Sequence, residues 1–211
     1  MPLEGGQPAR SPQPAGPDGP WLVMVSGMPA TGKTTLGRRL AADLGVPFFA
    51  KDELKETLFD TLGVGDRAWS RRLGAASMTL LRAIAEAMVS AGRSAVIEAN
   101  FTLAYDAPFY QVLMARAGVR VAQVWLTASP EAIIARFERR AASPQRHPGH
   151  VELANMDEFR QALAREDDAP LPLGGPIRRV DTNDFATLDY PALLEWLRAA
   201  LAGADAPGET S

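Results

Sequence analysis

The sequence predicts an α/β protein of three layers, in which helices cover both faces of a five-stranded parallel sheet. Apolar runs typical of strands alternate with amphipathic helical stretches between about Trp21 and Ala202. The first run, "WLVMVS", is continuously apolar, as expected for a strand that is buried on both faces. A glycine-rich segment, described below, joins that run to the first helical stretch.

The elements follow in strand–helix order along the chain. The predicted strands span residues 21–26, 46–50, 94–99, 119–127 and 177–182. Helices are predicted at 33–44, 52–62, 69–91, 105–117, about 156–165 and 190–201. Ser129 followed by Pro130 is a strong helix-start signal, because the serine caps the helix and proline suits its first position. A further helix is therefore expected from Pro130.

The chain of 211 residues suits one α/β domain, expected at residues 21–202. Residues 1–20 contain six prolines and four glycines, which predicts a disordered leader. The segment 203–211 resembles it in composition, so we expect a disordered tail.

Composition narrows the classes of function. A net charge of −3 gives no electrostatic reason to expect binding to long nucleic acid or to an anionic membrane. The absence of cysteine excludes disulfides, thiolate zinc sites and cysteine nucleophiles. No apolar run approaches the roughly 18 residues of a membrane span, and no signal-peptide pattern opens the chain. We expect a cytoplasmic protein; its oligomeric state is not predicted.

The segment "GMPATGKT", from Gly27 to Thr34, fits the P-loop pattern G-x-x-x-x-G-K-[ST] at every fixed position. Its lysine is one of only three in the chain, against nineteen arginines. In this motif the backbone N–H groups and the helix N-terminus surround phosphates, Lys33 reaches the β- and γ-phosphates, and the Thr34 hydroxyl binds Mg²⁺. We therefore predict a nucleotide site formed by Gly27, Met28, Pro29, Ala30, Thr31, Gly32, Lys33, Thr34 and Thr35.

A phosphate-binding loop does not by itself define a reaction. The chain lacks the Asn/Thr-Lys-x-Asp segment with which GTPases read guanine, since "VDTND" at 180–184 has no lysine. The only near match to the apolar strand ending in Asp of mechanical ATPases is "AVIE", which ends in Glu98. These differences favour a small kinase.

Asp52 is the candidate for the group that orients an attacking hydroxyl. It follows the second predicted strand, and all strands of a parallel sheet end at one edge, so Asp52 and the P-loop should face the same crevice. The alternative is that Asp52 only caps the next helix. Both roles are compatible.

Glu98 lies at the end of the third predicted strand and Asn100 just after it, so both reach the same edge. Glu98 could hold magnesium-bound water, and Asn100 could contact acceptor or phosphate. The alternative is a solvated strand end. Thr34 and Glu98 are therefore the candidate metal residues.

The segment 136–150, "RFERRAASPQRHPGH", combines clustered arginines with a break in the helical pattern. It predicts a mobile lid at about 136–155 that carries positive charge over the transferred phosphoryl group. The alternative is a solvated helix face. The candidate lid arginines are Arg136, Arg139, Arg140 and Arg146.

The stretch "SGMPATGKTTLGRRLAADLGVPFFAKDELKETL" resembles the opening of P-loop kinases that phosphorylate hydroxyls of small molecules. This group includes chloramphenicol phosphotransferase, gluconate kinase, the zeta toxins and the kinase domain of polynucleotide kinase. "VIEANF", "RFERR…RHPGH" and "VDTND" continue the resemblance, which covers most of residues 21–201. In two places the chain differs, with Lys51 before Asp52 and with Glu98 where Asp is commoner.

The resemblance implies a P-loop NTPase fold with strand order 2-3-1-4-5, and ATP and Mg²⁺ as cofactors. It also implies Asp52 as the hydroxyl-activating base, Arg136, Arg139 and Arg140 as lid arginines, and Asp181, Thr182 and Asn183 as residues flanking the adenine.

The acceptor is not readable from the sequence. Its candidate contacts are Asp52, Glu98, Asn100, Phe101 and Arg146. Aromatic residues, namely Phe48, Phe49, Trp69, Phe101, Tyr105 and Phe109, could line a partly apolar acceptor pocket or belong to the core. The leading hypothesis is a kinase for a small-molecule hydroxyl, on an antibiotic, a nucleoside or a sugar-like compound. The alternatives are a zeta-toxin-like or polynucleotide 5′-hydroxyl kinase and a non-kinase ATP-binding regulatory protein.

Overall fold

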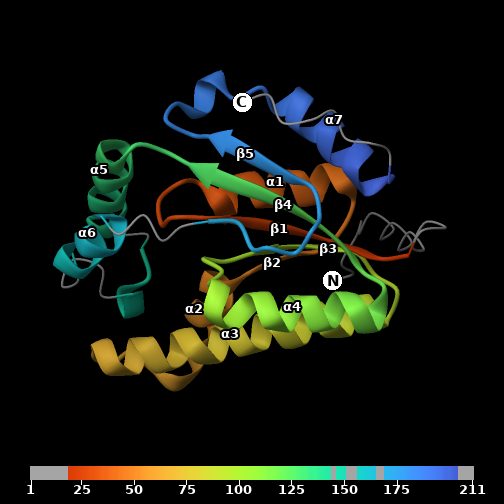
Figure 1. Ribbon diagram of the computed structural model, residues 1–211. Coiled ribbons are helices and arrows are strands. Elements are labelled where there is room, and N and C mark those ends of the chain that lie inside the picture. Colours follow the sequence, from red (N-terminus) through yellow and green to blue (C-terminus); the bar gives the residue numbers. More distant parts are fainter. Residues whose placement is uncertain (1–18, 144–145, 151–155, 165–168, 204–211) are drawn as a thin grey trace, which may run out of the picture.

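The computed structural model describes residues 19–143, 146–150, 156–164 and 169–203, and its centre is a five-stranded sheet (Figure 1). All four strand pairings are parallel, in the order β2-β3-β1-β4-β5. The strands are β1 (Trp21–Gly27), β2 (Phe48–Ala50), β3 (Ala95–Glu98), β4 (Arg120–Thr127) and β5 (Ile177–Asp181). This is the strand order of a P-loop NTPase fold, as the resemblance to P-loop kinases implied.

Helices separate the strands, as a parallel sheet requires. Their bounds are α1 (Lys33–Leu44), α2 (Lys51–Leu62), α3 (Arg67–Ser90), α4 (Leu103–Ala117), α5 (Pro130–Ala141), α6 (Met156–Ala164) and α7 (Tyr190–Leu201). The predicted capping of α5 is confirmed, because the Ser129 hydroxyl accepts a hydrogen bond from the N–H of Ala132. Two short 3-10 helices, Pro148–His150 and Phe185–Thr187, were not predicted.

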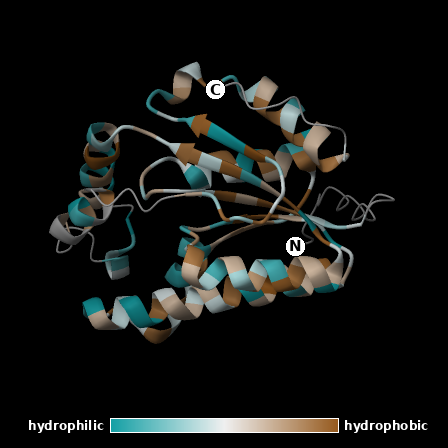
Figure 2. Ribbon diagram, in the orientation of Figure 1, coloured by the Kyte–Doolittle hydropathy of each residue, from teal (hydrophilic) through white to brown (hydrophobic). Residues whose placement is uncertain are grey.

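Alternate side chains of β1 point to two different hydrophobic cores, which makes the domain three-layered. Leu22 and Met24 pack with residues of α3 and α4 on one face. Val23 and Val25 pack with residues of α1 and α7 on the other face. Figure 2 shows the resulting hydrophobic character of the central strands. Burial on both faces is the reason that β1 is apolar without interruption.

A smaller cluster joins α5 and α6 beside the main domain. The rings of Phe137 and Phe159 stack with their centroids 3.9 Å apart, and Ile133 packs with them. Figure 1 shows α5 beyond the carboxyl ends of β4 and β5. Part of the predicted lid, residues 144–145 and 151–155, lies outside the described residues, as do 1–18 of the expected leader and 204–211 of the expected tail.

The helix α3 is longer at its start than the sequence predicted, because the Asp66 carboxylate caps it by accepting a hydrogen bond from the N–H of Trp69. By length and composition alone, this helix could cross a membrane, which the sequence analysis did not anticipate. That is weak evidence, since a core helix passes the same test. Leu73, Leu81 and Val89 of α3 are buried, and α3 lies against α2 and the sheet.

Candidate active site

The P-loop joins β1 to α1 in a backbone shape that only glycine adopts easily at two positions. Gly27 has φ 133° and Gly32 has φ 91°, both in the range that disfavours a side chain. A Cβ on Gly27 would collide with the Leu126 carbonyl oxygen, so the neighbouring strand also requires glycine there. The Lys33 ammonium, which is buried, donates hydrogen bonds of 2.8 Å to the carbonyl oxygens of Gly27 and Met28. The lysine is thus folded back into the loop.

Thr34 and Glu98 meet where the start of α1 faces the end of β3. The Thr34 hydroxyl donates a 2.9 Å hydrogen bond to a Glu98 carboxylate oxygen. Burial raises the pKa of Glu98, which is only 5% exposed; the Lys33 charge opposes this effect and the Asp52 charge adds to it. A cation placed between the two oxygens would lower the pKa again.

These two oxygen donors fit Mg²⁺, which prefers hard oxygen ligands and keeps several waters and phosphate oxygens of its substrate. Within the described part of the chain, no group of three or more His, Asp or Glu side chains is arranged to hold a metal alone. Thr34 and Glu98 therefore suit a metal that arrives with a nucleotide.

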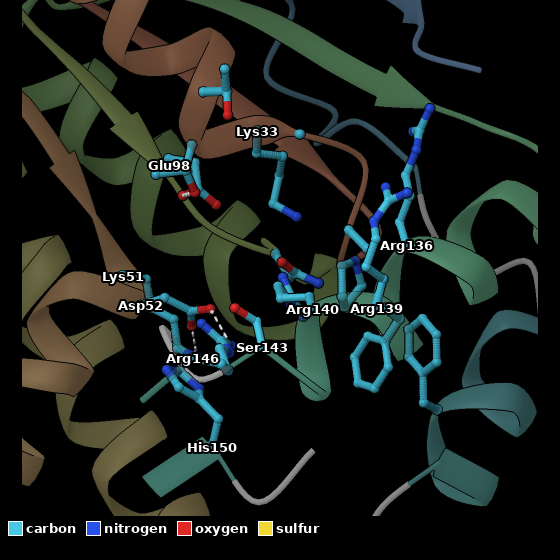
Figure 3. Close-up of a pocket in the computed structure, with 18 of the residues that line it drawn as sticks. Lys33, Lys51, Asp52, Glu98, Arg136, Arg139, Arg140, Ser143, Arg146 and His150 are labelled. Carbon is cyan, nitrogen blue, oxygen red and sulfur yellow. Dashed lines mark hydrogen bonds and ion pairs between the residues drawn. The ribbon is translucent and has the colours of Figure 1, made fainter. Parts of the chain in front are cut away.

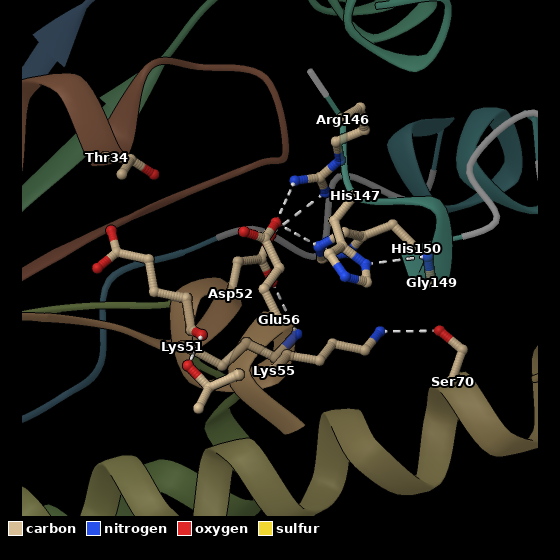
Figure 4. Close-up of polar contacts among 12 residues, drawn as sticks. Thr34, Lys51, Asp52, Lys55, Glu56, Ser70, Arg146, His147, Gly149 and His150 are labelled. Carbon is tan, nitrogen blue, oxygen red and sulfur yellow. Dashed lines mark hydrogen bonds and ion pairs between the residues drawn. The ribbon is translucent and has the colours of Figure 1, made fainter. Parts of the chain in front are cut away.

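Asp52 lies in the first turn of α2, between two cations (Figure 4). Its carboxylate is 3.1 Å from the Lys51 ammonium and 3.5 Å from the Arg146 guanidinium, and its side chain is 40% exposed. Burial acts to raise the pKa of Asp52, but the charges of Lys51, His150 and Arg146 outweigh it and hold the pKa well below its usual range. Burial lowers the pKa of His150 to about 3, so His150 is uncharged at neutral pH. The positive charges that keep the pKa of Asp52 low at neutral pH are therefore those of Lys51 and Arg146. Asp52 is therefore ionised and able to accept a hydrogen bond.

The segment 146–150 is attached to α2 by polar and aromatic contacts (Figure 4). Arg146 and His150 both bind one oxygen of Glu56, at 3.2 and 2.8 Å. The His147 ring stacks on Phe59, with centroids 5.2 Å apart. Gly149 lies so close to Phe59 that an added Cβ would be 2.5 Å from the ring. These contacts bring Arg146 to Asp52.

Arg136 connects the predicted lid to the segment predicted to flank adenine. Its guanidinium donates hydrogen bonds of 2.6 and 2.7 Å to the carbonyl oxygens of Thr182 and Asn183. Asn183 is itself held, since its side-chain oxygen accepts a hydrogen bond from the N–H of Ser129. Phe185, which follows, packs against Gly32 of the P-loop. In this structure Arg136 therefore fixes the backbone of residues 182–183.

Asn100 is positioned by a buried ion pair behind it. The Asp106 carboxylate, almost fully buried, accepts hydrogen bonds from Arg82 at 2.7 and 3.0 Å. Its other oxygen accepts from the N–H of Thr102 at 2.7 Å. The loop that carries Asn100 and Phe101 is thus fixed at the end of β3.

One cavity of about 840 Å³ brings these parts together (Figure 3). Lys33 and Glu98 lie at its P-loop end, and Asp52, Arg146 and His150 at the other (Figure 3). Thr34, bonded to Glu98, also lines the cavity. The predicted residues among its lining are Pro29, Ala30, Gly32, Lys33, Thr34, Thr35, Asp52, Glu98, Asn100, Arg136, Arg139, Arg140 and Arg146. Such a volume suits a ligand larger than a metal ion or a single phosphate.

Other predicted residues lie outside this lining. Phe101 packs edge-on against Tyr110, so the structure places it against the core and not at the cavity. Asp181 and Asn183 line a second, smaller depression of about 430 Å³. Phe48, Phe49, Trp69, Tyr105 and Phe109 do not line the described cavity either. Phe48, Phe49 and Phe109 pack against the cores, which is the second of the two alternatives that the sequence left open.

The sequence analysis missed several residues that do line the cavity: Lys55, Arg67, Ser143, His150 and Phe185. Lys55 could have been found, because it stands three residues after Asp52 and so shares its helical face. Arg67 and Phe185 gave no such signal, since they reach the cavity from distant segments.

The fold and the P-loop define a P-loop NTPase. The sequence matches the AAA domain family (AAA_33) over residues 22–165, and the chain belongs to this family. A "putative kinase" from Chloroflexus aurantiacus J-10-fl is 39% identical, with a TM-score of 0.79 over 86% of this chain and 98% of that one.

More distant structures share the fold alone. A sugar kinase from Janibacter sp. HTCC2649 has a TM-score of 0.57 at 18% identity, covering 88% of this chain and 98% of its own. A gluconokinase from Sinorhizobium meliloti 1021 has a TM-score of 0.50 at 16% identity, covering 87% and 93%. No curated protein shows significant similarity to this chain.

Proposed function

We propose that this protein is an ATP- and Mg²⁺-dependent kinase that transfers the γ-phosphoryl group of ATP to a hydroxyl of a small molecule. The observation that carries the proposal is one cavity with the P-loop at one end and an ionised Asp52 at the other. Arginines of α5 line the same cavity, and Arg146 lies beside Asp52. The 39% identical relative described as a kinase supports the same reaction class.

In this proposal each residue has a defined task. Lys33 exchanges its bonds to the loop carbonyls for the β- and γ-phosphates, and Arg139 and Arg140 neutralise charge on the transferred group. Thr34 and Glu98 hold Mg²⁺, which supplies Lewis-acid stabilisation of the phosphate oxygens. The acceptor oxygen bonds to the γ-phosphorus as the bridging bond to ADP breaks.

Asp52 serves mainly to orient the acceptor hydroxyl. A carboxylate with a strongly lowered pKa is a weak base, but a loose phosphoryl-transfer transition state demands little proton removal before the bond forms. Asp52 accepts the hydroxyl hydrogen bond and takes the proton late in the step. Lys51 and Arg146 keep it ionised until then.

The test is ADP release with ATP and Mg²⁺ across antibiotics, nucleosides, sugar acids, neutral sugars and 5′-hydroxyl oligonucleotides, with phosphorylated product identified by mass spectrometry. A compound that raises turnover at least tenfold over basal hydrolysis and gains one phosphoryl group supports the kinase. An oligonucleotide as the best acceptor would support the polynucleotide-kinase alternative. A flat panel despite tight ATP binding would favour a regulatory ATP-binding protein.

A further inference from the structure

The end of the cavity away from the P-loop is rich in positive charge. Lys51, Lys55, Arg67 and Arg146 line it, together with the single carboxylate of Asp52. Glu56, just behind, binds Arg146 and His150. Among the residues that the structure describes here, four cations face the two carboxylates of Asp52 and Glu56, so their summed charge is positive.

Lys55 differs from the other cations at this end. Its side chain extends from α2 toward α3, where the ammonium donates a 2.9 Å hydrogen bond to the Ser70 hydroxyl (Figure 4). Lys55 is only 6% exposed, and no carboxylate among the described residues lies within ion-pair distance of it. The ammonium also faces the Phe59 ring, 5.3 Å from its centroid. A hydroxyl and a ring face are both neutral, so the charge of this buried ammonium is only partly compensated.

The electrostatics of the cavity agree with this geometry. Burial lowers the pKa of Lys55 to about 8; Lys51, Arg67 and Arg146 act in the same direction, and Asp52 opposes them. An anion beside Lys55 would reverse this shift, because it favours the charged lysine. The site is thus better suited to an anion than to a neutral group.

We propose that the acceptor is an alcohol that carries an oxyanion, a carboxylate or a phosphate, and that Lys55 and Arg67 bind this oxyanion while Asp52 receives the hydroxyl. The proposal rests on the proposed kinase function and specifies its substrate class. Asp52 and Lys55 stand three residues apart on α2, where side chains begin about 5–6 Å from each other. The reacting hydroxyl and the oxyanion should therefore lie a few bonds apart in one small molecule.

This class differs from the neutral acceptors that an aromatic pocket would have indicated. Hydroxy acids and phosphorylated polyols belong to it, whereas phenicols and unmodified nucleosides do not. The simpler explanation of Lys55 is a structural tie between α2 and α3 through Ser70. That explanation predicts an effect on stability without any change in selectivity between charged and neutral acceptors.

The experiment compares matched compounds that differ in the oxyanion: D-glycerate or glycerol 3-phosphate against glycerol, and D-gluconate against D-glucitol. Binding is measured by calorimetry with the P-loop saturated by Mg²⁺ and a non-hydrolysable ATP analogue, so that an anion cannot occupy the phosphate site. ADP release is measured in parallel with ATP. The variants are Lys55→Met and, as a control of equal charge change, Arg116→Met, whose side chain is 72% exposed and pairs with Glu86 on the surface.

We expect at least one anionic compound to bind more tightly than its neutral partner, and Lys55→Met to weaken that binding by about tenfold or more. The variant should raise KM for the anionic acceptor and leave kcat, ATP affinity and the neutral compound unchanged. The preferred member, carboxylate or phosphate, identifies the oxyanion. Arg116→Met should behave as the wild type.

Two results would overturn the proposal: no anionic compound binds better than its neutral partner, or Lys55→Met leaves the preference intact. The kinase function fails separately. If anion binding depends on Lys55 but no acceptor accelerates ADP release, the anion site stands without the kinase. If a neutral compound is phosphorylated as well as its anionic partner, the kinase stands without the anion site.

Discussion

The Thr34 hydroxyl donates a 2.9 Å hydrogen bond to Glu98, which connects the first turn of α1 to the end of β3. The two residues are separated by 64 positions in the sequence, yet their side-chain oxygens meet beside Lys33 at the cavity. The glutamate side chain is long enough to reach the hydroxyl directly. In the proposed function this pair holds Mg²⁺.

Glu98→Gln tests the metal role of this pair. The variant keeps the shape but removes the charge, so we expect the Mg²⁺ concentration for half-maximal ADP release to rise about tenfold or more. Glu86→Gln, on the exposed side of α3 and paired with Arg116, is the control. An unchanged Mg²⁺ requirement in Glu98→Gln would remove Glu98 from the metal site.

Asp52→Asn tests the orientation of the acceptor. The amide cannot take the proton, so kcat should fall by about 10²–10⁴ while the dissociation constant for ATP changes little. Glu53→Gln is a close control, because the next residue points instead to Arg38 of α1 at 2.7 Å. Turnover that survives Asp52→Asn would refute its assignment.

Lys33→Met tests the phosphate contact. Loss of a charged donor to the β- and γ-phosphates should weaken ATP binding by about 10- to 100-fold, measured by titration with a fluorescent ATP analogue. The variant also frees the carbonyls of Gly27 and Met28, so a circular-dichroism melt must show that the fold persists. Unchanged ATP affinity in a folded variant would contradict the P-loop assignment.

Gly149→Ala tests whether docking of residues 146–150 on α2 matters for turnover. The added methyl collides with Phe59, so Arg146 should lose its position at Asp52 and kcat/KM should fall by about tenfold. Phe59→Leu in the same chain makes room for the methyl and should restore part of the activity. The double-mutant cycle gives the coupling between the two residues; additive losses would mean that they do not act together.

The pH dependence of stability follows from Lys55. Its pKa is about 8 in the folded protein, against 10.5 for an unperturbed lysine, so between these values the unfolded chain binds more protons. The free energy of unfolding contributed by this group therefore rises as pH increases from 8 to 10.5. Urea denaturation at several pH values between 8 and 10.5 should show the free energy of unfolding of the wild type rising with pH, and Lys55→Met should show a smaller rise. If the free energy of unfolding changes equally with pH in both proteins, Lys55 is more exposed to solvent than the structure shows.

The sequence alone determined the fold class and the phosphate end of the site, because both depend on local patterns. An apolar strand followed by a glycine turn and a helix specifies the P-loop through backbone geometry, and parallel strands align their ends at one edge. Asp52, Glu98 and Asn100 could be placed at the cavity for that reason, since each stands at or just after the end of a strand.

Only the tertiary structure decided which other side chains reach the cavity. Arg67 comes from the start of α3 and Phe185 from a 3-10 helix after β5, and the segment that carries Arg146 docks on α2. Amphipathic periodicity marks the face that a helix buries, but it does not say which elements meet there. For the same reason the sequence left open whether the aromatic residues line a pocket or belong to the core. Only the packed structure separates Phe101, which packs against the core, from Phe185, which lines the cavity.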